Sequence, residues 1–301
     1  MRKTSYQTLL NTRSKYDSML TSLGVVQKNN RWDEAYRLVT KLEQVRVEGT
    51  IDELSGEELG RMRFALTDIS NLSLILEQFD GDKSPIFESK FKEMLKGSKN
   101  QIEESNSSSR ARDTQFELLM CARFREVGLR AFLGDIHPDI SLEVNGHRYG
   151  FECKRIFNFN QGAVQSNIEK AISQLNNYFF DADSTRRGLP ILCIDRYITG
   201  GDKVLMAHDE ASVRKELGDQ IEEFVKRHYK RWNGAKAKDG RLIGVLIFMN
   251  VTAILNVEGL PVVCHQFGAS NSGWAGHFKL MFDDFVNEIA SLLGPMDRSR
   301  L

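Results

Sequence analysis

Three carboxylates and one lysine are spaced along the middle of the chain in a way that suits metal-dependent chemistry on a phosphate. Glu152 and Lys154 are separated by one residue, and Pro138-Asp139 ends thirteen residues before Glu152. A further acidic residue, Glu117, lies upstream. Mg²⁺ and Mn²⁺ prefer carboxylate oxygens, and a neighbouring ammonium group can stabilise developing negative charge. The pattern therefore indicates hydrolysis of a phosphodiester bond.

A β-hairpin is predicted to bring these residues together. Segments 140–144 and 148–156 read as strands and flank Asn145-Gly146, which is the strongest two-residue hairpin signal. In such a hairpin the residues just before the first strand lie opposite the later part of the second strand. The sequence thus predicts that the two halves of the motif meet across the sheet.

Strand geometry then assigns an expected role to each side chain. Residues two apart point to the same face, so Glu152 and Lys154 should project together. Asp139 should meet Glu152 from the adjacent strand, and the two carboxylates would bind Mg²⁺ or Mn²⁺. Lys154 would orient a water molecule and stabilise charge. Glu117, on the preceding helix, would complete the metal shell directly or through water.

The elements from residue 113 onward predict an α/β domain with a mixed central sheet flanked by helices. Nearly continuous apolar runs at 189–194 and 242–249 indicate buried strands. The other expected elements are a helix from 113 or 114 to 128, a short strand at 129–133, helices at 164–180 and 211–232, a surface loop at 268–276, and a closing amphipathic helix at 279–293.

The N-terminal part has a different pattern and predicts an all-α domain. Its apolar residues recur at helical spacing, and Ser55 and Glu58 form a capping-box pattern at one helix start. A serine-rich polar run then indicates a linker. We expect a helical domain at 1–104, a linker at 105–112 and the α/β domain at 113–301.

Composition restricts the class of protein without identifying it. The chain has 301 residues, of which 41% are hydrophobic, with 41 basic and 41 acidic side chains. Zero net charge counts against avid non-specific binding to nucleic acid, although a local basic groove would suffice. No apolar run reaches the length of a membrane span. We therefore expect no membrane association. The four cysteines lie far apart in apolar contexts, which predicts free thiols and a cytoplasmic location.

The motif resembles that of a known nuclease superfamily. Glu117, Pro138-Asp139, Glu152 and Lys154, on a helix–strand–hairpin plan, are similar to the PD-(D/E)xK nucleases, which have a restriction-endonuclease-like fold. The resemblance covers roughly residues 113–249. It implies that Asp139 and Glu152 are metal ligands, that Lys154 is the catalytic lysine, and that Glu117 is the helical acidic residue. It also implies Mg²⁺ as cofactor, with Mn²⁺ as a substitute.

Further residues are candidates for substrate contact. Gln174 and Tyr178 resemble the QxxxY element of the RecB-like branch, which implies that they line the substrate or brace the site. Arg155 lies beside the lysine, and Lys230 and Arg231 belong to the densest basic stretch, which could contact phosphates. A solvated helix end is the alternative explanation of that stretch.

We therefore expect a metal-dependent deoxyribonuclease, most simply an endonuclease in restriction, repair or phage defence, with RNA as the second candidate substrate. The helical domain would bind substrate, form a homodimer or dock onto a partner protein. The alternative is a non-catalytic nucleic-acid-binding or assembly module that retains the fold. Replacement of the metal ligands Asp139 and Glu152 should not change the properties of such a module.

Overall fold

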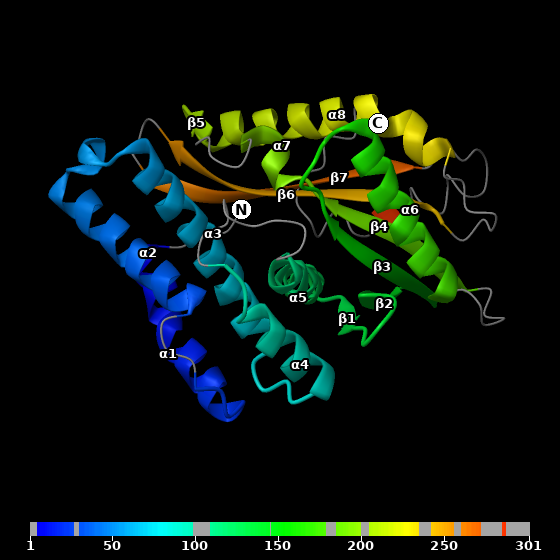
Figure 1. Cartoon of the computed structure of the whole chain (residues 1–301), viewed down its shortest axis with the longest axis horizontal. Coiled ribbons are helices and arrows are strands. Elements are labelled where there is room, and N and C mark those ends of the chain that lie inside the picture. The colour runs from blue at the N-terminus through cyan, green and yellow to red at the C-terminus, as the bar shows by residue number, and fades with distance from the viewer. Residues whose placement is uncertain are drawn as a thin grey trace. The chain divides into compact units, whose positions relative to one another are not determined.

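The computed structural model describes residues 5–26, 30–98, 109–144, 146–178, 185–199, 205–234, 242–255, 260–271 and 285–286. It contains helices and a mixed sheet, which confirms the α/β prediction (Figure 1). Contacts divide the chain into two compact units. The first comprises Met1–Ala122, Thr199–Glu210 and Val251–Cys264, and the second comprises Arg123–Ile198, Ala211–Asn250 and His265–Leu301. This division differs from the predicted boundary at 105–112.

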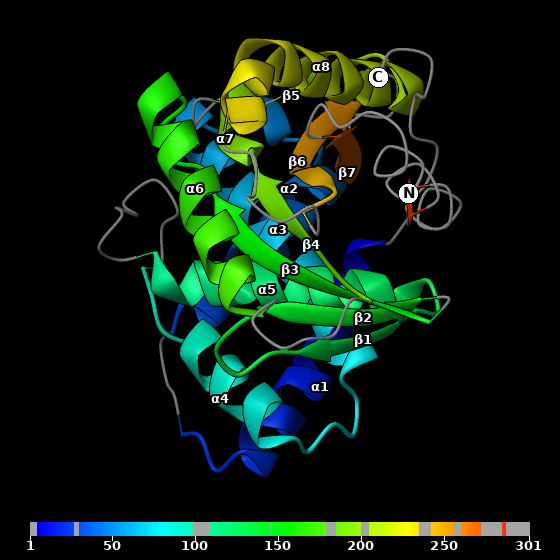
Figure 2. The same cartoon turned by 90° about the vertical axis from the view of Figure 1, so that its right-hand side faces the viewer.

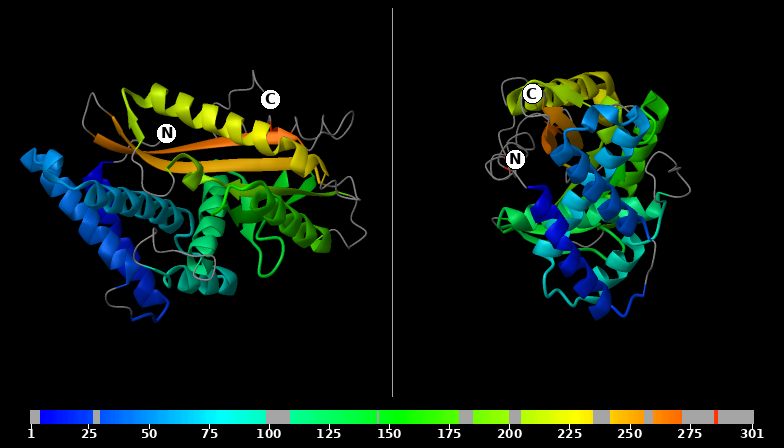
Figure 3. Two further views of the ribbon diagram at one scale, coloured as in Figure 1. Left: turned by 45° about the horizontal axis from the view of Figure 1, so that its top comes forward. Right: turned by 90° about the vertical axis from the view of Figure 1, so that its left-hand side faces the viewer.

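Helices dominate the first unit. They are α1 (Tyr6–Ser22), α2 (Arg31–Glu48), the short 3₁₀ helix η1 (Ile51–Glu53), α3 (Gly56–Gln78), α4 (Pro85–Met94) and most of α5 (Arg110–Glu126). Helices α1, α2 and α3 pack against one another, as Figure 3 also shows. The predicted capping box is present at the start of α3, where Ser55 and Glu58 each bond the other's backbone N–H.

A buried polar network fixes the start of α5. Arg112 donates to both carboxylate oxygens of Asp68, at 3.0 and 2.9 Å, and Gln115 donates to the same carboxylate at 3.1 Å. Arg31 in turn donates to the Gln115 side chain at 2.9 Å. Burial alone would raise the pKa of Asp68, but Arg112 and Arg31 lower it below its ordinary value. These contacts favour an ordered helix around Arg112.

The prediction for this segment was therefore partly wrong. Helix α5 begins at Arg110, inside the predicted linker and before the expected caps at Asp113 or Thr114. The reason is the buried anchor at Arg112, which the local sequence pattern does not reveal. Residues 105–108 of the predicted linker lie outside the described residues.

The sheet has seven strands in the described part of the chain. They are β1 (Arg130–Leu133), β2 (Ile140–Val144), β3 (His147–Arg155), β4 (Arg186–Cys193), β5 (Leu205–Ala207), β6 (Gly244–Leu255) and β7 (Leu260–Asn271). The order is β1-β2-β3-β4-β6-β5, and β7 also pairs with β6. The β1–β2 and β2–β3 pairs are antiparallel, whereas β3–β4, β4–β6 and β5–β6 are parallel.

The predicted hairpin and buried strands are confirmed. Val144 pairs with His147 at the end of the β2–β3 ladder, and Gly146 has a φ of 77°, which suits a glycine turn. Figure 2 shows β1 to β4 side by side, and α6 (Gln161–Tyr178) packs against β3 and β4. The hairpin is thus held between a neighbouring parallel strand and a covering helix.

The later elements only partly match expectation. Helix α8 (Glu210–Gly234) forms near the predicted position, and a short helix α7 (Asp195–Thr199) follows β4. The prediction of a surface loop beginning at Gly268 was wrong for residues 268–271. These residues belong to β7, which continues to Asn271, and Gly268 packs against Ile221 of α8. The predicted closing helix at 279–293 lies outside the described residues, apart from 285–286, which are helical. No helix among the described residues is both long and apolar enough to cross a membrane.

Candidate metal centre

The β2–β3 register places the two halves of the motif opposite each other. Ile140 pairs with Phe151, so Asp139, one residue before β2, lies beside Glu152. Asp139 Oδ2 accepts a 2.8 Å hydrogen bond from the backbone N–H of Cys153. The carboxylate of Asp139 is therefore fixed against the strand that carries Glu152, as the hairpin predicted.

A histidine joins the two carboxylates. His137, Asp139 and Glu152 each offer one ligand atom, and these atoms all lie within 4.8 Å of one another. His137 Nδ1 lies 2.9 Å from Glu152 Oε1. His137 is not among the candidate site residues predicted from the sequence, although its position directly before Pro138-Asp139 was a usable signal. The structure instead gives a cluster of two oxygen donors and one nitrogen donor.

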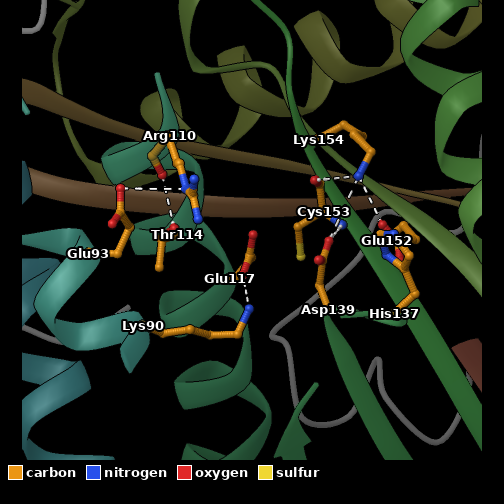
Figure 4. Close-up of polar contacts among 10 residues, drawn as sticks. All are labelled: Lys90, Glu93, Arg110, Thr114, Glu117, His137, Asp139, Glu152, Cys153 and Lys154. Atoms are coloured by element: carbon orange, nitrogen blue, oxygen red, sulfur yellow. Dashed lines mark hydrogen bonds and ion pairs between the residues drawn. The ribbon is translucent and has the colours of Figure 1, made fainter. Parts of the chain in front are cut away.

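Lys154 supplies positive charge to the same cluster. Its Nζ donates to Glu152 Oε2 at 3.0 Å and to the Cys153 carbonyl at 3.2 Å, and lies 3.8 Å from Asp139 Oδ2 (Figure 4). Glu152 and Lys154 thus project to the same face of β3, as their spacing predicts. Both oxygens of Glu152 are engaged, one by His137 and the other by Lys154.

Burial controls the charge state of these groups. The side chain of Glu152 is 0% exposed. Burial first, and the charge of Asp139 second, raise the pKa of Glu152 to about 8, against the opposing effect of Lys154. Burial alone would lower the pKa of Lys154, but Asp139 and Glu152 raise it above its ordinary value. A carboxylate that is buried although burial disfavours its charged form is typical of functional sites.

A glycine closes the loop that carries His137 and Asp139. The backbone N–H of Gly134 donates to the carbonyl of Asp139 at 2.8 Å. A Cβ atom at Gly134 would lie 1.7 Å from the carbonyl oxygen of Pro138, so any larger residue would displace the loop backbone. The close approach of the two chain segments therefore requires glycine and sets the position of two ligand candidates.

Helix α6 contributes the two residues of the QxxxY element. Gln174 Nε2 lies 3.2 Å from His137 Nε2, so Gln174 touches the cluster through the histidine. Tyr178 covers Gly150 of β3, where a Cβ atom would lie 2.9 Å from its ring and 3.2 Å from the Cβ of Pro138. Tyr178 therefore packs against β3, and its expected bracing role stays a prediction.

Glu117 belongs to the first unit, whereas the cluster belongs to the second. Its carboxylate forms an ion pair with Lys90 of α4, and both side chains are 15% exposed (Figure 4). Glu117 is not part of the His137–Asp139–Glu152 group. Its expected role as a further metal ligand stays a prediction.

The other candidate residues lie apart from the cluster or outside the description. Arg155 follows Lys154, so it faces the opposite side of β3, and its guanidinium lies 4.9 Å from the ring centre of Phe157. The side chains of Lys230 and Arg231 lie outside the described residues, although their backbone is part of α8. Their predicted contacts with phosphates stay predictions.

Asp195 has a structural contact rather than a place in the cluster. It begins α7, and its carboxylate accepts the backbone N–H of Asn250 at 2.6 Å. Burial raises the pKa of Asp195 to about 6, and the Asn250 bond opposes the rise. The carboxylate of Asp195 therefore bonds the backbone of β6 (Gly244–Leu255) at Asn250.

The donor set of the cluster fits a divalent cation. Two carboxylates suit Mg²⁺ and Mn²⁺, and an imidazole is a ligand for first-row transition ions. Gln174 contacts the Nε2 atom of His137 through its amide nitrogen. Comparison with known proteins gives no matching family model, no similar curated protein and no similar solved structure. We therefore infer function from the geometry of the cluster.

Proposed function

We propose that the protein is a metal-dependent nuclease of the PD-(D/E)xK class with a restriction-endonuclease-like α/β domain. One observation carries the proposal: Asp139 and Glu152 converge across the β2–β3 hairpin, with Lys154 bonded to one carboxylate and close to the other. The antiparallel hairpin, the parallel strand β4 and the helix α6 that covers them support the same fold assignment.

The metal would be held by Asp139 and Glu152. A bound Mg²⁺ or Mn²⁺ would supply acidification of a water molecule and neutralisation of charge on the phosphate. The chain's own contribution is to hold the two carboxylates in place: Cys153 N–H fixes Asp139, and burial fixes the side chain of Glu152. Because these restraints exist before any ligand binds, little reorganisation is needed at the site.

Lys154 would act as a cation beside the phosphate. Its Nζ is held by Glu152 and by the Cys153 carbonyl, so it is already positioned near the carboxylates. An ammonium group here would orient the attacking water and stabilise the negative charge that develops on the phosphoryl oxygens. Replacement by alanine should therefore affect turnover more than substrate binding.

The substrate proposed is DNA, with RNA as the second candidate. Two carboxylates, a metal and a lysine act on the phosphodiester and do not distinguish the sugar. We propose endonuclease action in restriction, repair or phage defence, by analogy with the superfamily. The helical first unit would supply substrate contacts, a homodimer interface or a docking surface for a partner.

A cleavage assay tests the proposal. Wild type should cut at least one of supercoiled plasmid, linear duplex, single-stranded DNA and RNA with Mg²⁺ or Mn²⁺, and EDTA should stop the reaction. Lys154→Ala and Asp139→Asn should be inactive. Lys170→Ala, which removes an exposed lysine from α6, is the matched control and should cut like wild type. Metal-independent cutting, or cutting by Lys154→Ala, would contradict the proposed chemistry.

A further inference from the structure

The imidazole of His137 is held at both of its nitrogen atoms. Nδ1 lies 2.9 Å from Glu152 Oε1 on the side of the carboxylates, and Nε2 lies 3.2 Å from Gln174 Nε2 on the side of α6. The side chain is 26% exposed, so the ring is partly shielded from solvent. Two contacts on opposite sides fix the plane and the direction of the ring.

Hydrogen-bond accounting identifies an unused acceptor behind the ring. Gln174 Oε1 is buried and has no hydrogen-bond partner among the described residues. With the amide nitrogen toward His137, Nε2 accepts and Nδ1 carries the proton that Glu152 accepts. A half-turn of the amide would place Oε1 toward Nε2 instead. Nε2 would then donate to Gln174, and Nδ1 would present a lone pair to the carboxylates.

We propose that His137 is a third metal ligand of this centre and that Gln174 is the residue that positions it. This inference rests on the proposed function, because it assigns a further ligand to the same metal. The half-turn gives the buried oxygen of Gln174 a partner and frees Nδ1 on the side where Asp139 and Glu152 lie. Metal-binding histidines usually donate their other N–H to such an acceptor.

The third ligand changes which ion the site should select. Mg²⁺ favours oxygen ligands and retains water, whereas imidazole nitrogen favours Mn²⁺ and later transition ions over Mg²⁺. A site made from His137, Asp139 and Glu152 should therefore bind Mn²⁺ more tightly than Mg²⁺. The carboxylates alone would discriminate less. Mn²⁺ is thus the cofactor that the geometry favours for this centre.

Electron paramagnetic resonance on the full chain tests the assignment without any substrate. Bound Mn²⁺ should show spin-echo modulation from an imidazole ¹⁴N in wild type, and His137→Ala and His137→Asp should lose it. His137→Asp supplies an oxygen ligand and should narrow the Mn²⁺-over-Mg²⁺ preference by ~10-fold or more. Gln174→Leu should weaken Mn²⁺ binding by ~10–100-fold, while Gln174→Glu, which keeps an acceptor, should retain most of the affinity.

The controls separate the outcomes. Asn177→Leu changes an exposed residue of the same helix and should match wild type. If wild type binds Mn²⁺ without nitrogen modulation, His137 is not a ligand and the inference fails, while the two-carboxylate centre stands. Wild-type affinity and modulation in Gln174→Leu would overturn the positioning role. If wild type binds no Mn²⁺ at all, the proposed function fails as well. Should Gln174→Leu not fold by circular dichroism, His137→Asp and Gln174→Glu carry the test.

Discussion

Replacing Glu152 by glutamine should stabilise the metal-free protein at alkaline pH. The side chain is 0% exposed, and burial with the charge of Asp139 raises its pKa from 4.5 to about 8. The folded state therefore binds this proton more tightly than the unfolded state does. The stability from the protonated group is fully present below pH 4.5 and is lost as the pH rises toward 8.

The size of the effect follows from the pKa difference. Each pH unit between the two pKa values corresponds to ~1.4 kcal/mol, so the loss across this window is at most on the order of 5 kcal/mol. Glutamine stays neutral, keeps the shape and still accepts from Lys154. We expect Glu152→Gln to be more stable than wild type by ~2–4 kcal/mol at pH 8.5 in EDTA, and to show little difference at pH 4.5.

Urea unfolding followed by circular dichroism at both pH values measures this difference. Glu169→Gln, an exposed change on α6, is the matched control and should not alter the pH dependence. Saturating Mn²⁺ should raise the stability of wild type by ~2.7 kcal/mol at 100 times Kd, and should leave Glu152→Gln unchanged. If Glu152→Gln is less stable than wild type at pH 8.5 without metal, the charged carboxylate of Glu152 does not destabilise the folded state, which contradicts this prediction.

Three further predictions concern the metal, the loop and the helical unit. Mn²⁺ affinity should rise with pH toward about 8 and then level off, because Glu152 must lose its proton to bind the ion. Calorimetry in buffers of different ionisation enthalpy would count the released proton. An affinity that does not change with pH would contradict this prediction. Gly134→Ala should reduce Mn²⁺ affinity by ~10-fold or more through the backbone clash. Gly162→Ala should not, because a Cβ atom there would lie 3.7 Å from Asn160 Oδ1, an ordinary van der Waals distance. Arg112→Leu should destabilise the protein by ~3–5 kcal/mol in urea because it leaves Asp68 buried without its main partner; a change below ~1 kcal/mol would refute the anchoring role.

The fold was predictable where the signal was local. Asn145-Gly146 specifies a tight turn by its backbone preference, and apolar runs marked β4 and β6. The end of β7 was missed because Gly268 and Ser270 carry no strand preference, and pairing with β6 decides their conformation. The start of α5 was missed for a similar reason, since a buried long-range ion pair at Arg112 outweighs the polar local sequence.

The site was predictable where strand periodicity alone sets direction. The two-residue spacing of Glu152 and Lys154 placed both on one face, and the hairpin register brought Asp139 to them. The role of His137 was not predictable in this way, because it lies in a loop whose path depends on the close approach at Gly134. Complete burial of Glu152 likewise follows from neighbouring elements rather than from its own sequence context.

Metal-dependent cleavage, measured for wild type and for Lys154→Ala side by side, is the decisive test of the proposed nuclease centre. A panel of plasmid, linear duplex, single-stranded DNA and RNA should be incubated with Mn²⁺, with Mg²⁺ and with EDTA, at equal protein concentration. We predict cutting by wild type only when a divalent ion is present, with Mn²⁺ more effective than Mg²⁺, and none by Lys154→Ala. Absence of cutting by wild type on every substrate, together with no measurable Mn²⁺ binding, would contradict the account.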